Sequence, residues 1–277
     1  MNRMNAWAAQ TWTILRISLQ ERLIYRAEFA LSAALRFLPI LTRIFLWLTV
    51  YAVVGSQGNT TIAGYDRDAM IGYYLLTMLV RLASAAPGVS TQIAREIRTG
   101  TFRRYLVQPI DFLGFTFLNQ LAHKAVYFLS GMVPLSIMLW CCRGFLPSLP
   151  SAPVLVMFAV SASLAFLLAF LIDAILGVIG FWFLDISSLL FVYTGTIFFF
   201  SGQMFPLELL PGGIGVVAQW LPMRFFIHFP TAILLGRLTP EQIGTGLGAE
   251  LAWVVGSLAL LRILFHFGVR RYEGYGG

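Results

Sequence analysis

Apolar stretches long enough to cross a bilayer recur along most of this sequence, and they constrain its fold more than any other feature. A transmembrane helix needs about 20 mostly apolar residues to cross roughly 30 Å of hydrocarbon. Charged residues make up only 11% of the chain, whereas a soluble domain carries roughly 25%. The pattern predicts an all-α, polytopic membrane protein with one transmembrane domain over residues 1–277. We place six spans at residues 29–54, 69–90, 114–141, 154–181, 187–203 and 247–268.

The placement of basic residues predicts the orientation of these spans. The formal net charge is +7, and most arginines fall in the N-terminal segment, at 91–112 and in the tail. Because cytoplasmic loops carry an excess of Lys and Arg, we expect both termini in the cytoplasm. The turn near Asp185 should also be cytoplasmic but has no basic residue, so charge does not fix the boundary between spans four and five. No basic run lies in a polar domain, and we expect no nucleic-acid partner.

Two segments outside the spans have patterns of their own. In residues 5–27, apolar side chains recur at three- and four-residue spacing with arginines between them. This pattern predicts an amphipathic helix at the cytoplasmic interface. Residues 202–240 are apolar but contain five prolines. Proline breaks helices, so we expect short re-entrant helices that enter from the extracytoplasmic side, shielded by protein. The residues that we assign to a gate there are Gly202, Pro206, Leu210, Pro211, Pro222 and Pro230.

Sequence patterns of catalysis are absent. The chain contains no G-x-x-x-x-G-K-[ST], H-E-x-x-H or G-x-S-x-G pattern. Its three histidines are scattered, and its two cysteines, Cys141 and Cys142, are adjacent, which is not the spacing of a metal site. We therefore expect no catalytic residue, no metal site and no directly bound cofactor.

We single out four charged residues within the predicted spans, where a charge is costly unless it is paired or reaches the interface. Two of them are seven residues apart and share a helix face. They could line a polar path for a substrate, or they could be structural, as paired or snorkelling side chains; we favour the structural interpretation. The four residues are Arg36, Arg43, Arg81 and Asp173.

The most charged stretch of the chain is residues 91–112, between spans two and three. Arg95, Arg98 and Phe102 fall at helical spacing, and Gly100 interrupts the helix between two threonines. A short amphipathic helix at this place could dock into a groove on a soluble partner. The same residues fit a solvated basic loop that binds anionic headgroups, and the residue pattern alone leaves both interpretations open.

Part of this stretch, IAREIRTGTFRRYLVQPI, resembles the coupling-helix region of type-2 ATP-binding-cassette exporter permeases. An E-x-x-x-G-T pattern followed by L-x-x-P is typical of that region. Residues 201–236 are similar to the family's segment between spans five and six, with an S-G-x-x-x-P-L-x-x-L-P run that begins at Ser201. The resemblance covers nearly the whole chain and is strongest to small bacterial permeases that often occur as two different subunits with a separate ATPase. The first pattern is matched by Glu96, Gly100, Thr101, Leu106 and Pro109.

The resemblance implies partners, a location and a function. It implies a homodimer or heterodimer of permeases in the bacterial plasma membrane, with cytoplasmic ATPase subunits that bind ATP and Mg. It also implies export of an amphiphilic, drug-like or lipid-like substrate by alternating access, in which the ATPase pushes on residues 93–109 and tilts spans one, two and five. The alternatives are an ATPase-independent channel or secondary carrier, and a membrane-assembly protein. The residues implied for ATPase coupling are Arg95, Glu96, Arg98, Gly100, Thr101, Arg103, Arg104, Leu106 and Pro109.

Overall fold

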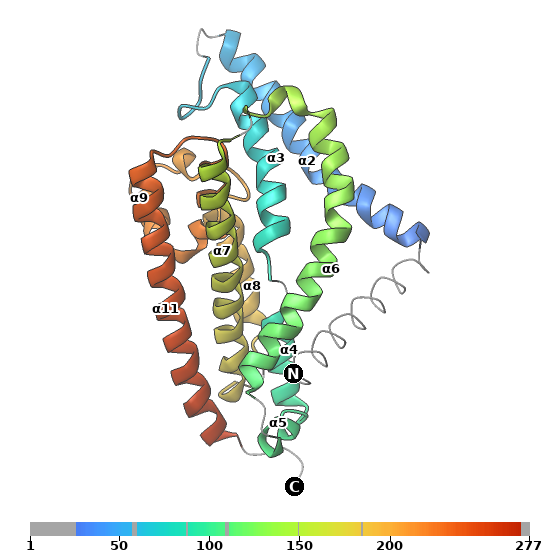
Figure 1. Ribbon diagram of the computed structural model, residues 1–277, viewed down its shortest axis with the longest axis vertical. Coiled ribbons are helices and arrows are strands. Elements are labelled where there is room, and N and C mark those ends of the chain that lie inside the picture. Colours follow the sequence, from blue (N-terminus) through green and yellow to red (C-terminus); the bar gives the residue numbers. More distant parts are fainter. Residues whose placement is uncertain are drawn as a thin grey trace. The chain divides into compact units, whose positions relative to one another are not determined.

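Helices dominate the computed structural model (Figure 1). It describes residues 26–56, 60–86, 88–108, 111–148, 150–183 and 185–272, with the side chains of 26–37 and 56 left out. Over these ranges the chain has no strand, and Ile62 and Tyr65 form a lone antiparallel bridge. The predicted all-α class is therefore confirmed for the described residues. The predicted interfacial helix at 5–27 lies almost wholly outside them, with only its last two residues at the start of the first described helix.

Long helices alternate with short ones along the chain. The long helices are α2 (Arg26–Ser56), α3 (Arg67–Ser84), α6 (Phe112–Cys141), α7 (Ala152–Val178) and α11 (Pro240–Arg271). The shorter α-helices are α4 (Val89–Arg98), α5 (Arg103–Val107), α8 (Ser187–Phe200), α9 (Gly212–Trp220) and α10 (His228–Leu234). The 3-10 helices are η1 (Arg143–Phe145), η2 (Ile179–Phe181), η3 (Leu207–Leu209) and η4 (Pro222–Phe225).

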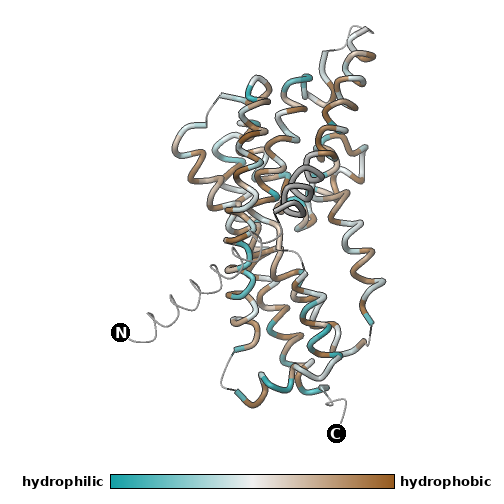
Figure 2. Tube along the Cα trace, turned by 90° about the vertical axis from the view of Figure 1, so that its right-hand side faces the viewer, coloured by the Kyte–Doolittle hydropathy of each residue, from teal (hydrophilic) through white to brown (hydrophobic). Residues whose placement is uncertain are grey.

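Five helical segments of the described chain are long and apolar enough to cross a membrane. Figure 2 shows hydrophobic residues along most of their length. The predicted fifth span, 187–203, corresponds to α8, which has only 14 residues. At 1.5 Å per residue this helix is about 21 Å long, so it falls short of the length of the other spans. The five segments are Leu38–Gly55, Arg67–Arg98, Phe112–Cys141, Ala152–Phe181 and Pro240–Arg271.

The contacts divide the chain into two compact units, and the first comprises the residues up to Leu75 together with Gly114–Leu146. In this unit, polar atoms of aromatic side chains tie the end of α2 to the chain that follows it. The Tyr51 hydroxyl donates a hydrogen bond of 2.6 Å to the Tyr65 carbonyl. The Trp47 indole N–H donates one of 2.9 Å to the Tyr74 hydroxyl. These bonds let large aromatic rings pack together without leaving their polar atoms unpaired.

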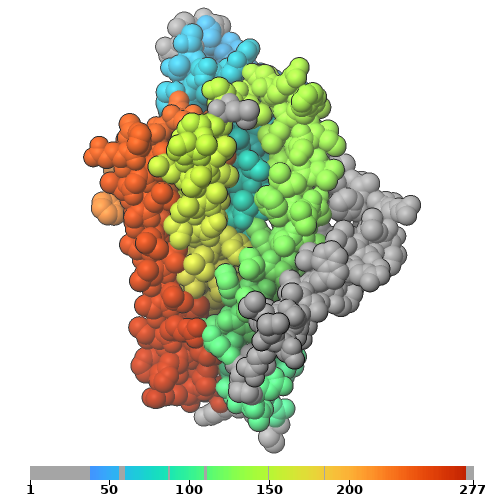
Figure 3. All heavy atoms as spheres, viewed as in Figure 1, coloured from blue at the N-terminus to red at the C-terminus, as the bar shows by residue number. Residues whose placement is uncertain are grey.

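The second unit comprises Leu76–Leu113 and Pro147–Gly277, and α7 and α11 form its centre. The two helices pack side by side, as Figure 3 shows for α11 in red and orange beside α7 in yellow. Glycines bring neighbouring segments close to α11. A Cβ on Gly268 would lie 2.3 Å from Cδ2 of Phe181, and one on Gly246 would lie 2.2 Å from Cε2 of Phe229. Only glycine leaves room for these two phenylalanine rings against the helix.

Residues 201–239 of the second unit are broken into short helices, of which the longest, α9, has nine residues. None of them is long enough to cross a bilayer. The His228 amide donates to the Ser201 carbonyl (2.9 Å), which closes the segment on itself. The Ser84 hydroxyl donates to the Phe226 carbonyl (2.7 Å), which joins the segment to the end of α3. Of the residues assigned to a gate, Gly202, Pro206, Pro222 and Pro230 are buried, Leu210 is half-buried and Pro211 is exposed.

Candidate functional site

The charged segment between α3 and α6 forms an amphipathic helix, α4, with one face against α7. The side chains of Val89, Ile93 and Ile97 are buried on this face. Two glycines on the partner side permit the close approach. A Cβ on Gly177 would lie 2.8 Å from Cβ of Ile93, and a Cβ on Gly180 would lie 3.3 Å from Cα of Ala94. The apolar face of α4 therefore packs against α7 and η2 of the same chain.

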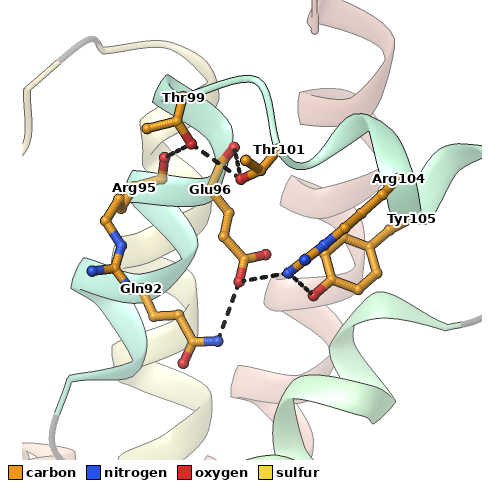
Figure 4. A network of polar contacts seen from close by, with 7 residues as sticks. All are labelled: Gln92, Arg95, Glu96, Thr99, Thr101, Arg104 and Tyr105. Carbon is orange, nitrogen blue, oxygen red and sulfur yellow. Dashed lines mark hydrogen bonds and ion pairs between the residues drawn. The ribbon is translucent and has the colours of Figure 1, made fainter.

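A closed turn follows α4. Gly100 has φ 75°, a left-handed conformation that glycine adopts without the strain of a Cβ. The Glu96 carbonyl accepts hydrogen bonds from the Phe102 amide (3.0 Å) and from the Thr101 hydroxyl (3.3 Å). The Thr99 hydroxyl donates to the Arg95 carbonyl (2.8 Å), as Figure 4 shows. These bonds satisfy carbonyls that the end of a helix would otherwise leave unpaired.

The carboxylate of Glu96 points into the chain and away from Arg95 (Figure 4). Only 8% of the residue is exposed. Its Oε1 accepts a hydrogen bond from Nε2 of Gln92 (3.3 Å) and lies 3.6 Å from Nη2 of Arg104. Its Oε2 is buried and has no hydrogen-bond partner among the described residues. The carboxylate thus joins α4 to the start of α5 and keeps one acceptor unused.

Arg104 is held in place by Tyr105 as well as by Glu96. Its Nη2 donates a hydrogen bond of 2.7 Å to the Tyr105 hydroxyl, and its guanidinium carbon lies 4.7 Å from the centre of that ring. A cation over an aromatic face is attracted by the ring quadrupole. The basic side chain is therefore oriented, although it remains largely exposed.

Phe102 anchors the turn in a cluster of aromatic rings. Its spacing predicted that it shares a helix with Arg95 and Arg98, but α4 ends at Arg98 and Phe102 lies in the turn. Its side chain is fully buried. The ring centre lies 5.0 Å from that of Phe112, 5.3 Å from Phe181 and 5.2 Å from Tyr272. Phe112 begins α6, Phe181 ends η2 and Tyr272 follows α11, so the turn is fixed to the ends of three other helices.

The other residues predicted for coupling lie mostly at the surface. The exposed side chains on α4, in the turn and on α5 are basic or polar apart from two apolar ones, with Val107 84% exposed. Gly100 is buried within the turn, and Pro109 lies outside the described residues. We call this surface the basic face. It consists of Arg95, Arg98, Thr99, Thr101, Arg103, Arg104, Leu106 and Val107.

The charged residues predicted within the spans have different environments. Asp173 on α7 is buried, and its Oδ2 accepts a hydrogen bond of 3.0 Å from the Ser90 amide at the start of α4. Arg43 is half-buried, with its guanidinium carbon 5.6 Å from the centre of the Tyr74 ring. Arg81 is exposed, and the side chain of Arg36 lies outside the described part. Asp173 is therefore hydrogen-bonded to a backbone amide, and the structural interpretation of these four charges stays a prediction.

Three further charged residues lie inside the apolar helices and were not among the four predicted from the sequence. Glu250 on α11 is fully buried and accepts a hydrogen bond of 2.9 Å from the Ser161 hydroxyl on α7. Arg262 on α11 makes two bonds to the Asp111 carboxylate, of 3.1 and 2.9 Å. Lys124 on α6 is buried with its ammonium 5.7 Å from the Tyr127 ring. Each stands out as an ionisable residue in an apolar stretch, and that signal could have identified all three.

Within the described residues, no group of three or more His, Cys, Asp or Glu side chains is arranged to hold a metal ion. Several long apolar helices and one amphipathic helix with a basic face define a multi-pass membrane protein. The family described as ABC-2 family transporter protein matches residues 37–276, and the chain belongs to this family. It is therefore a membrane component of a transporter, of the permease type. No curated protein matches the chain.

Proposed function

We propose that this chain is the permease subunit of an ATP-driven exporter that moves an amphiphilic, drug-like or lipid-like substrate out of the cytoplasm. The observation that supports this most is the basic face, because it lies on a turn that is closed by hydrogen bonds and held by the buried Phe102 ring. ATP and Mg would bind to a separate ATPase subunit, which would dock on this face. A second permease subunit, identical or different, would complete the complex in the bacterial plasma membrane.

The fixed shape of the basic face favours docking to a protein over binding to lipid headgroups. A mobile basic loop is sufficient for anionic lipids, because that attraction depends mainly on charge. Here the turn is closed on the Glu96 carbonyl, and Phe102 is buried among aromatic rings. Such preorganisation reduces the entropy lost when a partner binds. In this proposal the arginines and threonines contact the ATPase, and Glu96 shapes the surface from inside.

The proposal includes six spans, with α8 as the fifth, and cytoplasmic termini. It places α4 and α5 in the cytoplasm and the short helices of residues 201–239 on the extracytoplasmic side, where they re-enter the membrane and close the path. The arginine distribution along the chain supports this orientation. The many buried residues among 222–234 support a closure packed against protein.

Purification of the tagged chain from its native membrane tests the function. We expect a soluble ATP-binding-cassette ATPase to copurify, and we expect the reconstituted complex to hydrolyse ATP faster with some members of a panel of lipids, antibiotics and apolar peptides. Substrate movement without any associated ATPase would instead establish a channel or secondary carrier. A complex with neither transport nor ATPase activity would favour a membrane-assembly role.

The orientation gives a prediction for cysteine labelling. Thr61 precedes α3 and Thr99 follows α4, and both are exposed. In a variant with Cys141 and Cys142 replaced by serine, we expect Thr61→Cys to react with a membrane-impermeant maleimide from outside intact cells. Thr99→Cys should react only after the cells are opened. Equal reactivity of both sites in intact cells would contradict the topology.

A further inference from the structure

The start of α4 lacks the usual stabilisation of a helix N-terminus. Its N-cap residue is Gly88, which has no side chain and makes no side-chain cap. Four amides at a helix N-terminus have no partner within the helix, and they attract negative charge. The Asp173 carboxylate fills this role from another helix, because its Oδ2 accepts the Ser90 amide at 3.0 Å. The bond is buried and joins residues 83 positions apart.

Two more contacts hold α4 to the same part of the second unit. Gly177 lies one turn after Asp173 on α7, and a Cβ there would come within 3.0 Å of the Ser90 Cα. At the other end of α4, Phe102 packs against Phe181 of η2 and Phe265 of α11, with ring centres 5.3 and 6.1 Å apart. The amphipathic helix is thus fixed at both ends to α7, η2 and α11.

We propose that Asp173 is a positioning residue, whose carboxylate anchors the start of α4 to α7 so that α4, α7 and α11 move as one body. If the proposed function is correct, a push by the ATPase on the basic face would be transmitted directly to α7 and α11, which are spans four and six. That consequence rests on the proposed function. The family resemblance implies movement of spans one, two and five instead. The anchor itself depends only on this chain and can be tested without the ATPase.

Hydrogen exchange in the purified full-length chain tests the anchor. Asp173→Leu removes the acceptor at similar side-chain size, and we expect amides in the first turn of α4 to exchange about tenfold faster, the scale of a lost hydrogen bond to a charged group. Asp173→Asn keeps an acceptor and should restore most of the protection. Unchanged exchange at residues 88–92 in Asp173→Leu would overturn the proposal.

Asp185 provides a matched control. It is an exposed carboxylate that accepts hydrogen bonds from the Ser187 hydroxyl (2.6 Å) and amide (2.8 Å) at the start of α8. These bonds hold the pKa of Asp185 below its usual value. Asp185→Leu should speed exchange at the start of α8 and leave α4 unchanged. Faster exchange in α4 with this control would show a general loss of folding and would also overturn the specific anchor.

Spin labels test whether the helices move as one body. We would place labels at Thr91→Cys on α4 and Val160→Cys on α7, both exposed, in a chain with Cys141→Ser and Cys142→Ser. A single narrow distance distribution is expected, broadened by Asp173→Leu and restored by Asp173→Asn. If an ATPase copurifies, the distance should stay constant between nucleotide-free and vanadate-trapped complexes, and substrate moved per ATP should fall in Asp173→Leu. If the distance between the labels changes with nucleotide in the chain that keeps Asp173, one-body movement is overturned. If no ATPase copurifies, that result counts against the proposed function alone.

Discussion

Replacing Phe102 with alanine should destabilise the protein by about 3–5 kcal/mol, the usual cost of removing a buried phenylalanine side chain. The ring is fully buried and has aromatic neighbours from three other parts of the second unit. Its loss leaves a cavity where the turn after α4 meets η2 and the end of α11. Unfolding of the purified chain in mixed micelles with increasing denaturing detergent would measure the change.

Phe191 offers a matched control for this substitution. It lies on α8, and its side chain is 81% exposed. Phe191→Ala changes the same atoms without opening a cavity, so the free energy of unfolding should change by less than about 1 kcal/mol. Equal destabilisation by the two variants would show that the aromatic cluster does not hold the turn.

Replacing Glu96 with arginine should weaken assembly with the ATPase by roughly 1–3 kcal/mol, or about 5- to 150-fold in affinity. The new guanidinium would occupy a buried site beside Arg104, whose Nη2 now lies 3.6 Å from the Glu96 carboxylate. Repulsion would open the turn and disorder the basic face. Transport should also become uncoupled from hydrolysis. Titration of the purified ATPase against the reconstituted permease, with transport per ATP, measures both effects.

This substitution also separates the two interpretations of the charged segment. If the segment only binds anionic lipid, one more positive charge should preserve membrane association and leave ATPase assembly intact. Glu241→Arg is the matched control, because Glu241 is exposed in the first turn of α11, and it should leave assembly unchanged. Normal assembly and the original rate of transport per ATP in Glu96→Arg would rule out a coupling role for Glu96.

The long helices were predictable because each needs a long apolar stretch. The ends of the predicted spans 29–54 and 114–141 differ by at most three residues from those of α2 and α6. The fifth span was predicted too long, since α8 ends at Phe200. Gly202 follows with φ 81°, and the chain turns there. Apolar residues continue through such a turn, so an apolar pattern alone does not show where the helix ends.

The site was predictable only in part. The spacing of Arg95 and Arg98 correctly indicated an exposed basic side of α4. The same spacing places Glu96 three residues after Ile93, on the buried side, but the charge of glutamate suggested a surface position. The contact between Asp173 and Ser90 joins two distant segments. No local pattern in a single sequence contains such a pairing, because it arises from the packing of α4 on α7.

If α8 is the fifth span of the proposed transporter, its shortness has a consequence for the surrounding membrane. Its 14 residues cover about 21 Å, roughly 9 Å less than the hydrocarbon thickness of an average bilayer. None of its residues is buried. If α8 crosses the membrane, the adjoining lipid has to compress, at a cost of fractions of a kcal/mol per Å. The leaflets are then strained and close together at this one place, so an amphiphile released beside α8 has the shortest distance to travel between headgroup layers.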